Sequence, residues 1–203
     1  METILYSKEE DIGIIKLNRP EVYNIVNKPM IREIDALFDE IKDDQYIKAV
    51  VIASNSDKAF CTGMDLKNAS KLTPEETKKL LELGQALYQK IEEFPKPVIA
   101  AINALALGGG LEMSLACDDR VIVEGAKVGT VETSVGVIPA WGGTQRLPRI
   151  VGKGIAAEMI FTGGQINAKQ ALECGLVTKI VSSTDELILA AIEKAKSLKN
   201  EEE

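Results

Sequence analysis

Apolar residues recur along this chain with two different periods, and the period changes many times. Short β-branched runs, typical of strands, alternate with segments whose apolar residues lie three and four positions apart, typical of helices. Ile12–Asn18 and Ala49–Ser54 predict strands, and Pro29–Lys42 between them predicts a helix. Lys96–Ile102 predicts a further, buried strand. Such alternation predicts an α/β protein.

Capping residues mark where several predicted helices begin and end. Thr73–Glu76 combines an N-cap, a proline at the first helical position and an acidic first turn, and predicts a helix to about Glu93. Asn167 and Thr184 are the expected N-caps of two later helices, and Gly175 ends the first of them. The remaining predicted elements are strands over Arg120–Glu124, Lys127–Thr130 and Leu176–Val181, and helices over Leu111–Ala116, Ile155–Phe161, Ala168–Cys174 and Asp185–Leu198.

Two segments lie outside this pattern. Glycines and a proline interrupt it over residues 142–152, GGTQRLPRIVG, where we predict no element. The acidic tail Glu201–Glu203 is expected to be disordered. No linker rich in Ser, Pro or Gly divides the chain, so we predict a core over residues 1–183 and a short C-terminal helix and tail over 184–203.

Charge and composition exclude several classes of partner. The net charge of −7 disfavours nucleic acids and anionic membranes, which bind clustered Lys and Arg. No apolar run reaches the roughly 18 residues that span a bilayer. The start, METILYSKEED, lacks the basic and apolar regions of a signal peptide, so we expect a cytoplasmic protein.

Cysteine and histidine usage limits the chemistry further. Cys61, Cys117 and Cys174 are far apart and form no C-x-x-C pair, so neither a disulfide framework nor a metal site is predicted. The chain contains no histidine, which excludes Ser-His-Asp and Cys-His catalysis. Acid–base chemistry would fall to carboxylates, Lys or Tyr.

Two glycine-containing turns are candidates for binding an oxygen of a ligand. Gly108–Gly110 lies between a predicted strand and a helix, where free amides favour negative charge, although close packing without a ligand also explains such glycines. The segment lacks the G-x-G-x-x-G and G-K-[ST] patterns of nucleotide sites. Gly63 precedes Met64 in a second turn, whose amide could be another donor. Two converging amides would form an oxyanion hole.

Two glutamates accompany these turns. Glu112 lies in the first turn of the helix that the glycines open, and Glu132 lies in an apolar, glycine-rich stretch. Each could be an ordinary helix-start or loop carboxylate. Placed together beside an oxyanion hole, they would handle protons next to an enolate.

Five blocks of the sequence, in order, resemble the crotonase superfamily, also called the enoyl-CoA hydratase/isomerase family. They are LNRPEVYN, KAFCTGMDL, KPVIAAINALALGGGLEMSLACD, VGVIPAWGGTQRLPRIVG and TGGQINAKQALECGLVTKIV. The resemblance covers nearly all of residues 4–181. It implies a crotonase-like spiral of ββα units, here with a short C-terminal helical segment, acyl-CoA thioester substrates, and assembly into trimers or hexamers.

The resemblance also assigns residues. Met64 and Gly109 match the two amides that hold the thioester oxygen, and Glu112 and Glu132 match the paired glutamates of the hydratase branch. We expect no metal and no cofactor other than the CoA carried by the substrate. Substrate-binding candidates are Cys61, Gly63, Asp65, Leu66 and Gly108, with Lys58 and Lys67 for the CoA phosphates.

The predicted function is therefore an enoyl-CoA hydratase. The alternatives are an enoyl-CoA isomerase or another acyl-CoA enzyme of the family, and a non-catalytic binding protein on the same fold. Two positions depart from common family residues, Ala104 and Met64, and family members typically continue with further C-terminal helices that cover the acyl pocket and contact other subunits.

Overall fold

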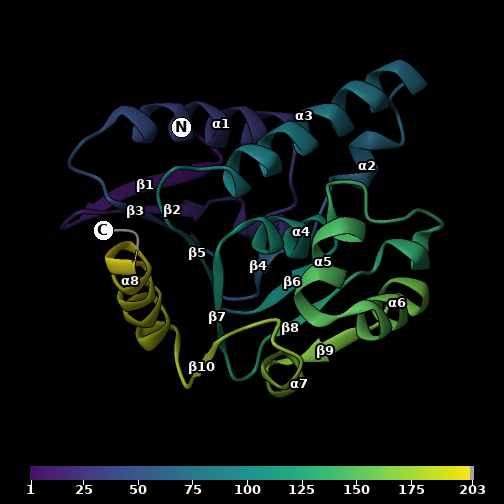
Figure 1. Cartoon of the computed structure of the whole chain (residues 1–203). Coiled ribbons are helices and arrows are strands. Elements are labelled where there is room, and N and C mark those ends of the chain that lie inside the picture. Colours follow the sequence, from purple (N-terminus) through teal and green to yellow (C-terminus); the bar gives the residue numbers. More distant parts are fainter. Residues whose placement is uncertain (202–203) are drawn as a thin grey trace.

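Two β-sheets organise the protein, which a computed structural model describes over residues 1–201 (Figure 1). The larger sheet has the order β1-β2-β3-β5-β7-β10 in this part of the chain. β1 and β2 are antiparallel, and each later pair is parallel. Its strands are β1 (Ile4–Glu9), β2 (Ile12–Leu17), β3 (Ala49–Ser54), β5 (Val98–Ile102), β7 (Asp119–Val123) and β10 (Lys179–Val181).

The smaller sheet follows the order β4-β6-β8-β9. Its first two pairs are parallel and the last is antiparallel. Its strands are β4 (Ala59–Cys61), β6 (Leu105–Leu107), β8 (Lys127–Gly129) and β9 (Gln165–Asn167). β4 and β6, both next to the glycine turns, are too short for the hydrophobic pattern to delimit them.

The chain passes repeatedly from the larger sheet to the smaller one and then into a helix. β3 and β4 precede α2 (Leu66–Ala69) and α3 (Pro74–Glu92), and β5 and β6 precede α4 (Gly109–Ala116). β7 and β8 precede the 3₁₀ turn η2 (Glu132–Val135) and α5 (Gly143–Val151). This succession confirms the predicted α/β spiral of ββα units. The other helical elements are η1 (Pro20–Val22), α1 (Lys28–Asp43), α6 (Lys153–Thr162), α7 (Ala168–Glu173) and α8 (Thr184–Glu201).

Several predicted boundaries and one predicted break are wrong; for example, β10 begins at Lys179 and not at Leu176. The N-cap of α8 is Ser183, whose hydroxyl accepts a hydrogen bond from the amide of Glu186 at 3.3 Å, and not Thr184. Glu201 ends α8, whereas residues 202–203 of the predicted tail lie outside the described residues. α5 occupies the segment predicted to be broken, because Arg146, Leu147 and Val151 bury one helical face despite Pro148.

Strand side chains alternate between two apolar cores. Val50 and Ile52 of β3 face the core shared with α1, α3 and α4, whereas Val51 faces the second core. α8 covers that second core with the predicted stripe, of which Ala191 and Ala195 are fully buried. α1 and α3 lie side by side on the opposite side of the larger sheet (Figure 1).

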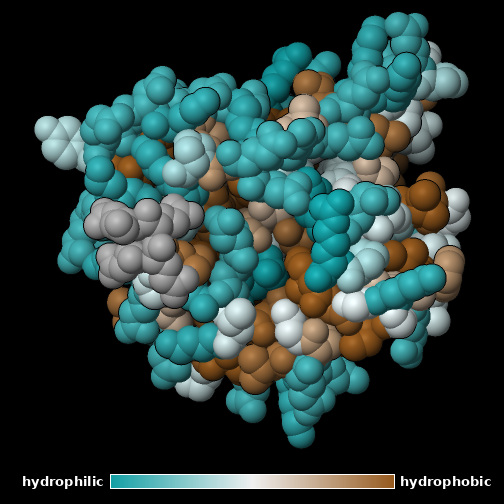
Figure 2. Space-filling model, in the orientation of Figure 1, coloured by the Kyte–Doolittle hydropathy of each residue, from teal (hydrophilic) through white to brown (hydrophobic). Residues whose placement is uncertain are grey.

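Hydrophobic surface gathers on the side of the molecule where α5, α6 and α7 lie (Figure 2). Phe161 of α6 is 81% exposed, and Val135, Val137 and Ile138 are also exposed. No helix within residues 1–201 is both long and apolar enough to cross a membrane.

Candidate active site

Two backbone turns meet where β4 and β6 end. Gly63, with φ of +96°, follows β4, and Gly108, with φ of +53°, is the N-cap of α4. A Cβ atom at Gly63 would lie 3.1 Å from the amide nitrogen of Gly109. Among the described residues, the Met64 and Gly109 amides donate no hydrogen bond to a protein acceptor. The structure thus brings together the two amides predicted to form an oxyanion hole.

Each of the three consecutive glycines has its own physical reason. Gly108 adopts a backbone conformation that side chains disfavour. A Cβ atom at Gly109 would lie 2.7 Å from the Trp141 ring, and one at Gly110 would lie 2.1 Å from the carbonyl oxygen of Cys61. Close packing of α4 and an accessible amide therefore occur in the same turn, which combines the two explanations left open by the sequence.

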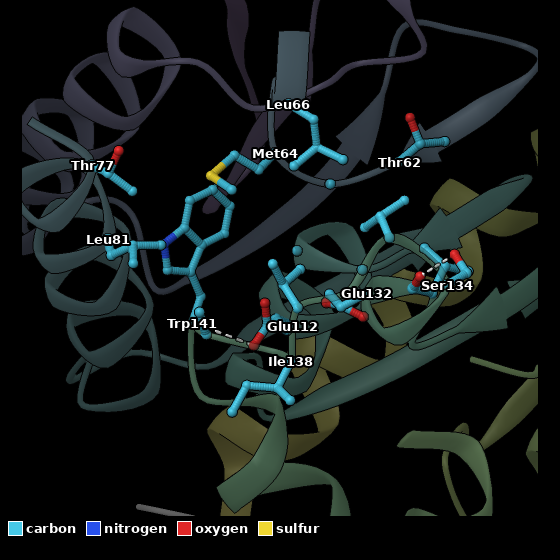
Figure 3. A pocket seen from close by; sticks show the side chains of 17 residues that line it. Thr62, Met64, Leu66, Thr77, Leu81, Glu112, Glu132, Ser134, Ile138 and Trp141 are labelled. Carbon is cyan, nitrogen blue, oxygen red and sulfur yellow. Dashed lines mark hydrogen bonds between the residues drawn. The ribbon is translucent and has the colours of Figure 1, made fainter. Parts of the chain in front are cut away.

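Glu112 is 2% exposed and is held by two backbone amides. Its Oε1 atom accepts hydrogen bonds of 2.8 Å from Trp141 and from Gly143, so Oε2 is left for the cavity (Figure 3). Burial raises the pKa of Glu112 to about 7, and the charge of Glu132 adds to the rise, whereas the two amides oppose it.

Glu132 begins η2 and points into the same cavity from the other side (Figure 3). Both of its carboxylate oxygens are buried without a hydrogen-bond partner among the described residues. A Cβ atom at Gly108 would lie 3.3 Å from Oε1, so the carboxylate lies against the glycine turn. Burial raises the pKa of Glu132 and favours its neutral form.

A cavity of about 230 Å³ contains these groups. Its lining is mostly apolar and includes the turns at Met64 and Gly109, both glutamates, and the side chains of Leu81 and Trp141. Across the described residues, no three His, Cys, Asp or Glu side chains cluster as metal ligands would. The arrangement offers two amide donors and two carboxyl groups with raised pKa values in one mostly apolar cavity.

Comparisons with known proteins identify the family. The sequence profile described as Enoyl-CoA hydratase/isomerase matches residues 7–203. Crotonyl-CoA hydratase of Syntrophomonas wolfei is 40% identical over 89% of this chain and 69% of its own length. Short-chain-enoyl-CoA hydratase of Clostridium acetobutylicum is 36% identical over 91% of this chain and 71% of its own. The chain belongs to the enoyl-CoA hydratase/isomerase family.

A solved structure supports the fold of this family member independently. The crystal structure of enoyl-CoA hydratase from Bacillus anthracis superimposes with a TM-score of 0.92 at 38% identity. The match covers 96% of this chain and 76% of the crystallised one. The resemblance seen in the sequence is therefore confirmed in three dimensions.

The remaining predicted site residues divide into two groups. Gly63, Leu66 and Gly108 line the cavity. The other four, Cys61, Asp65, Lys58 and Lys67, do not. Cys61 is fully buried, and burial raises its pKa to about 12, while the carboxylate of Asp65 caps α2 by accepting from the Asn68 amide. Lys58 and Lys67 are exposed, and their contact with CoA phosphates stays a prediction.

Three residues that the sequence did not single out pack against residues of the site or donate hydrogen bonds to them. Trp141 is 2% exposed and packs edge-to-face on Tyr88, with ring centroids 5.4 Å apart. The Tyr88 hydroxyl donates to the carbonyl oxygen of Gly109 at 2.8 Å. Arg146 donates to the carbonyl oxygen of Trp141 at 2.9 Å. Only the apolar character of the block around Trp141 hinted at these contacts.

Proposed function

We propose that this protein adds water across the 2,3-double bond of a short 2-enoyl-CoA thioester. The observation that carries the proposal is the convergence of two free amides, Met64 and Gly109, with Glu112 and Glu132 in one cavity. The relatives named crotonyl-CoA hydratase and short-chain-enoyl-CoA hydratase support both the reaction and a short acyl chain.

The two amides would bind the thioester oxygen. Attack at C3 moves electrons onto that oxygen and produces an enolate-like species, which backbone N–H donors stabilise. Each such donor contributes on the order of 3 kcal/mol to the transition state. The apolar lining keeps competing water away from the developing charge.

Glu112 would act as the general base. Two amides fix its Oε1, which leaves Oε2 to accept a proton from the water that attacks C3. A pKa of about 7 keeps a substantial fraction of carboxylate at neutral pH while giving a base of useful strength.

Glu132 would act as the general acid. Its oxygens have no hydrogen-bond partner among the described residues, and burial raises its pKa; in its protonated form it would donate its proton to C2 as the enolate collapses. The C3–O and C2–H bonds form while the π bond is lost. Glu112 ends protonated and Glu132 ends ionised, so exchange of protons with solvent restores the starting state.

The proposal includes no cofactor besides the CoA portion of the substrate. We also propose a cytoplasmic homotrimer or hexamer, with a core over residues 1–183 and Lys58 and Lys67 placed for CoA phosphates. An isomerase would shuttle one proton through one carboxylate, whereas the cavity presents two. A non-catalytic binding protein would retain CoA affinity without turnover.

The decisive experiment follows the loss of conjugated-thioester absorbance when crotonyl-CoA is mixed with the wild type, Glu112→Gln and Glu132→Gln. Removing either general acid–base group should lower kcat about 100- to 10,000-fold. Activity on 3-enoyl thioesters with only a mild effect of Glu112→Gln would instead indicate an isomerase. Binding of CoA without turnover of either substrate would contradict both the hydratase and the isomerase function.

A further inference from the structure

One short loop separates Glu112 from a buried arginine. On one side of this loop, the amides of Trp141 and Gly143 donate to Oε1 of Glu112, at 2.8 Å each. On the other side, the carbonyl oxygen of Trp141 accepts from Nη1 of Arg146 at 2.9 Å. The direction of the loop amides is thus constrained from both sides.

The arginine itself is held in place. Arg146 is 8% exposed, and its Nε and Nη2 atoms donate to Oε2 of Glu92 at 3.0 and 2.6 Å. Gly142, with φ of +109°, lies so close that a Cβ atom there would be 1.9 Å from Nη1. The guanidinium therefore links α3, α5 and the loop through a planar set of donors that lysine cannot reproduce.

We infer that Arg146 is a positioning residue for Glu112, acting through the Trp141 carbonyl and not through contact with substrate. This inference rests on the proposed role of Glu112 as general base. With the loop held, both amides face Oε1, and Oε2 is left to the attacking water. A purely structural link between α3 and α5 would change the pKa of Glu112 only through the lost charge of Arg146, which lysine restores in full.

The consequence is measurable as a shift in the titration of Glu112. The charged or titratable groups that face it are Glu132 from η2, Arg146 from α5 and Tyr88 from α3. The loop amides lower the pKa of Glu112 against the effect of burial. Loss of their alignment should raise that pKa and move the acid limb of the rate profile to higher pH.

The test compares Arg146→Met with Arg146→Lys and with Arg149→Met, which removes an exposed arginine of the same helix. Side-chain ¹³C NMR gives the pKa of Glu112 in each protein, with the signal assigned by its loss in Glu112→Gln. We expect a rise of about one pH unit in Arg146→Met, a smaller rise in Arg146→Lys, and none in Arg149→Met. If Arg146→Met does not fold, the lysine variant still gives the result.

Kinetics on crotonyl-CoA supply the second readout. We expect a 10- to 100-fold lower kcat in Arg146→Met with less than a threefold change in KM, and no additional loss when it is combined with Glu112→Gln. An unchanged Glu112 titration, full restoration by lysine, or an equal loss in the Glu112→Gln background would overturn the inference. A wild type without hydratase activity whose Glu112 still titrates higher in Arg146→Met would overturn the proposed function and leave the positioning role intact.

Discussion

The two glutamates of the cavity lie in regions that differ in packing. Glu112 belongs to α4, of which every residue is buried. Glu132 begins η2, which contains no buried residue in the structure as described, and the nearby Val135 and Ile138 are 56% and 64% exposed. Backbone amides fix the first carboxylate, whereas the second is only desolvated. One cavity therefore contains a carboxylate that is oriented by hydrogen bonds and another that is buried without a side-chain partner in the described structure.

The largest effect should come from breaking the packed region. Gly110→Ala would place a methyl group 2.1 Å from the carbonyl oxygen of Cys61, which belongs to a buried strand. Because neither backbone can move freely, we expect a loss of about 3 kcal/mol in the free energy of unfolding, or no folding.

Urea denaturation measures this loss, with Gly125→Ala as the matched control. A Cβ atom at Gly125 would meet nothing within 4 Å, so its effect should stay within about 0.5 kcal/mol. Equal stabilities of the two variants would show that α4 is not rigidly held.

Much of this packed region was predictable from the sequence because its signals are local. The glycines, Glu112 and the strand before them are contiguous, and their order predicts a glycine turn between a strand and a helix. The support from Tyr88 and Arg146 was not predictable. The Tyr88 hydroxyl reaches Gly109 from another helix, and Arg146 turns back onto the Trp141 carbonyl from a segment where no element was predicted. α5 was missed because Pro148 and two glycines hide a helix whose buried face is set by tertiary contacts.

The second-largest effect should be a pH dependence of the free energy of unfolding that arises from Glu112. Its pKa of about 7 in the folded protein exceeds the unfolded value, so the folded state binds the proton more tightly. The contribution of Glu112 to the free energy of unfolding is complete below about pH 4.5 and is lost as the pH rises through 7.

Glu112→Gln should therefore be more stable than the wild type at pH 8, by about 1–3 kcal/mol, and similar to it at pH 5. Denaturant titrations at the two pH values measure the difference, and Glu132→Gln offers the comparison with a carboxylate that has no amide partner. A variant that is less stable than the wild type at pH 8 would contradict the account of Glu112 as a base whose ionised form is destabilised by burial.

The smallest effect should come from the exposed loop beside Glu132. Ile138→Ser replaces a side chain that is 64% exposed and should change the free energy of unfolding by less than about 0.5 kcal/mol. Leu111→Ala, next to Glu112 and fully buried, should cost about 2–5 kcal/mol in the same assay. Similar losses in both variants would remove the contrast between the two regions.

The most direct test of the central claim is to incubate the wild-type protein with crotonyl-CoA in ¹⁸O-labelled water and to analyse the product by mass spectrometry. The account predicts a 3-hydroxyacyl thioester that carries the labelled oxygen at C3, with none formed by Glu112→Gln or Glu132→Gln above a trace. A product with a migrated double bond and no labelled oxygen, or unchanged substrate, would contradict it.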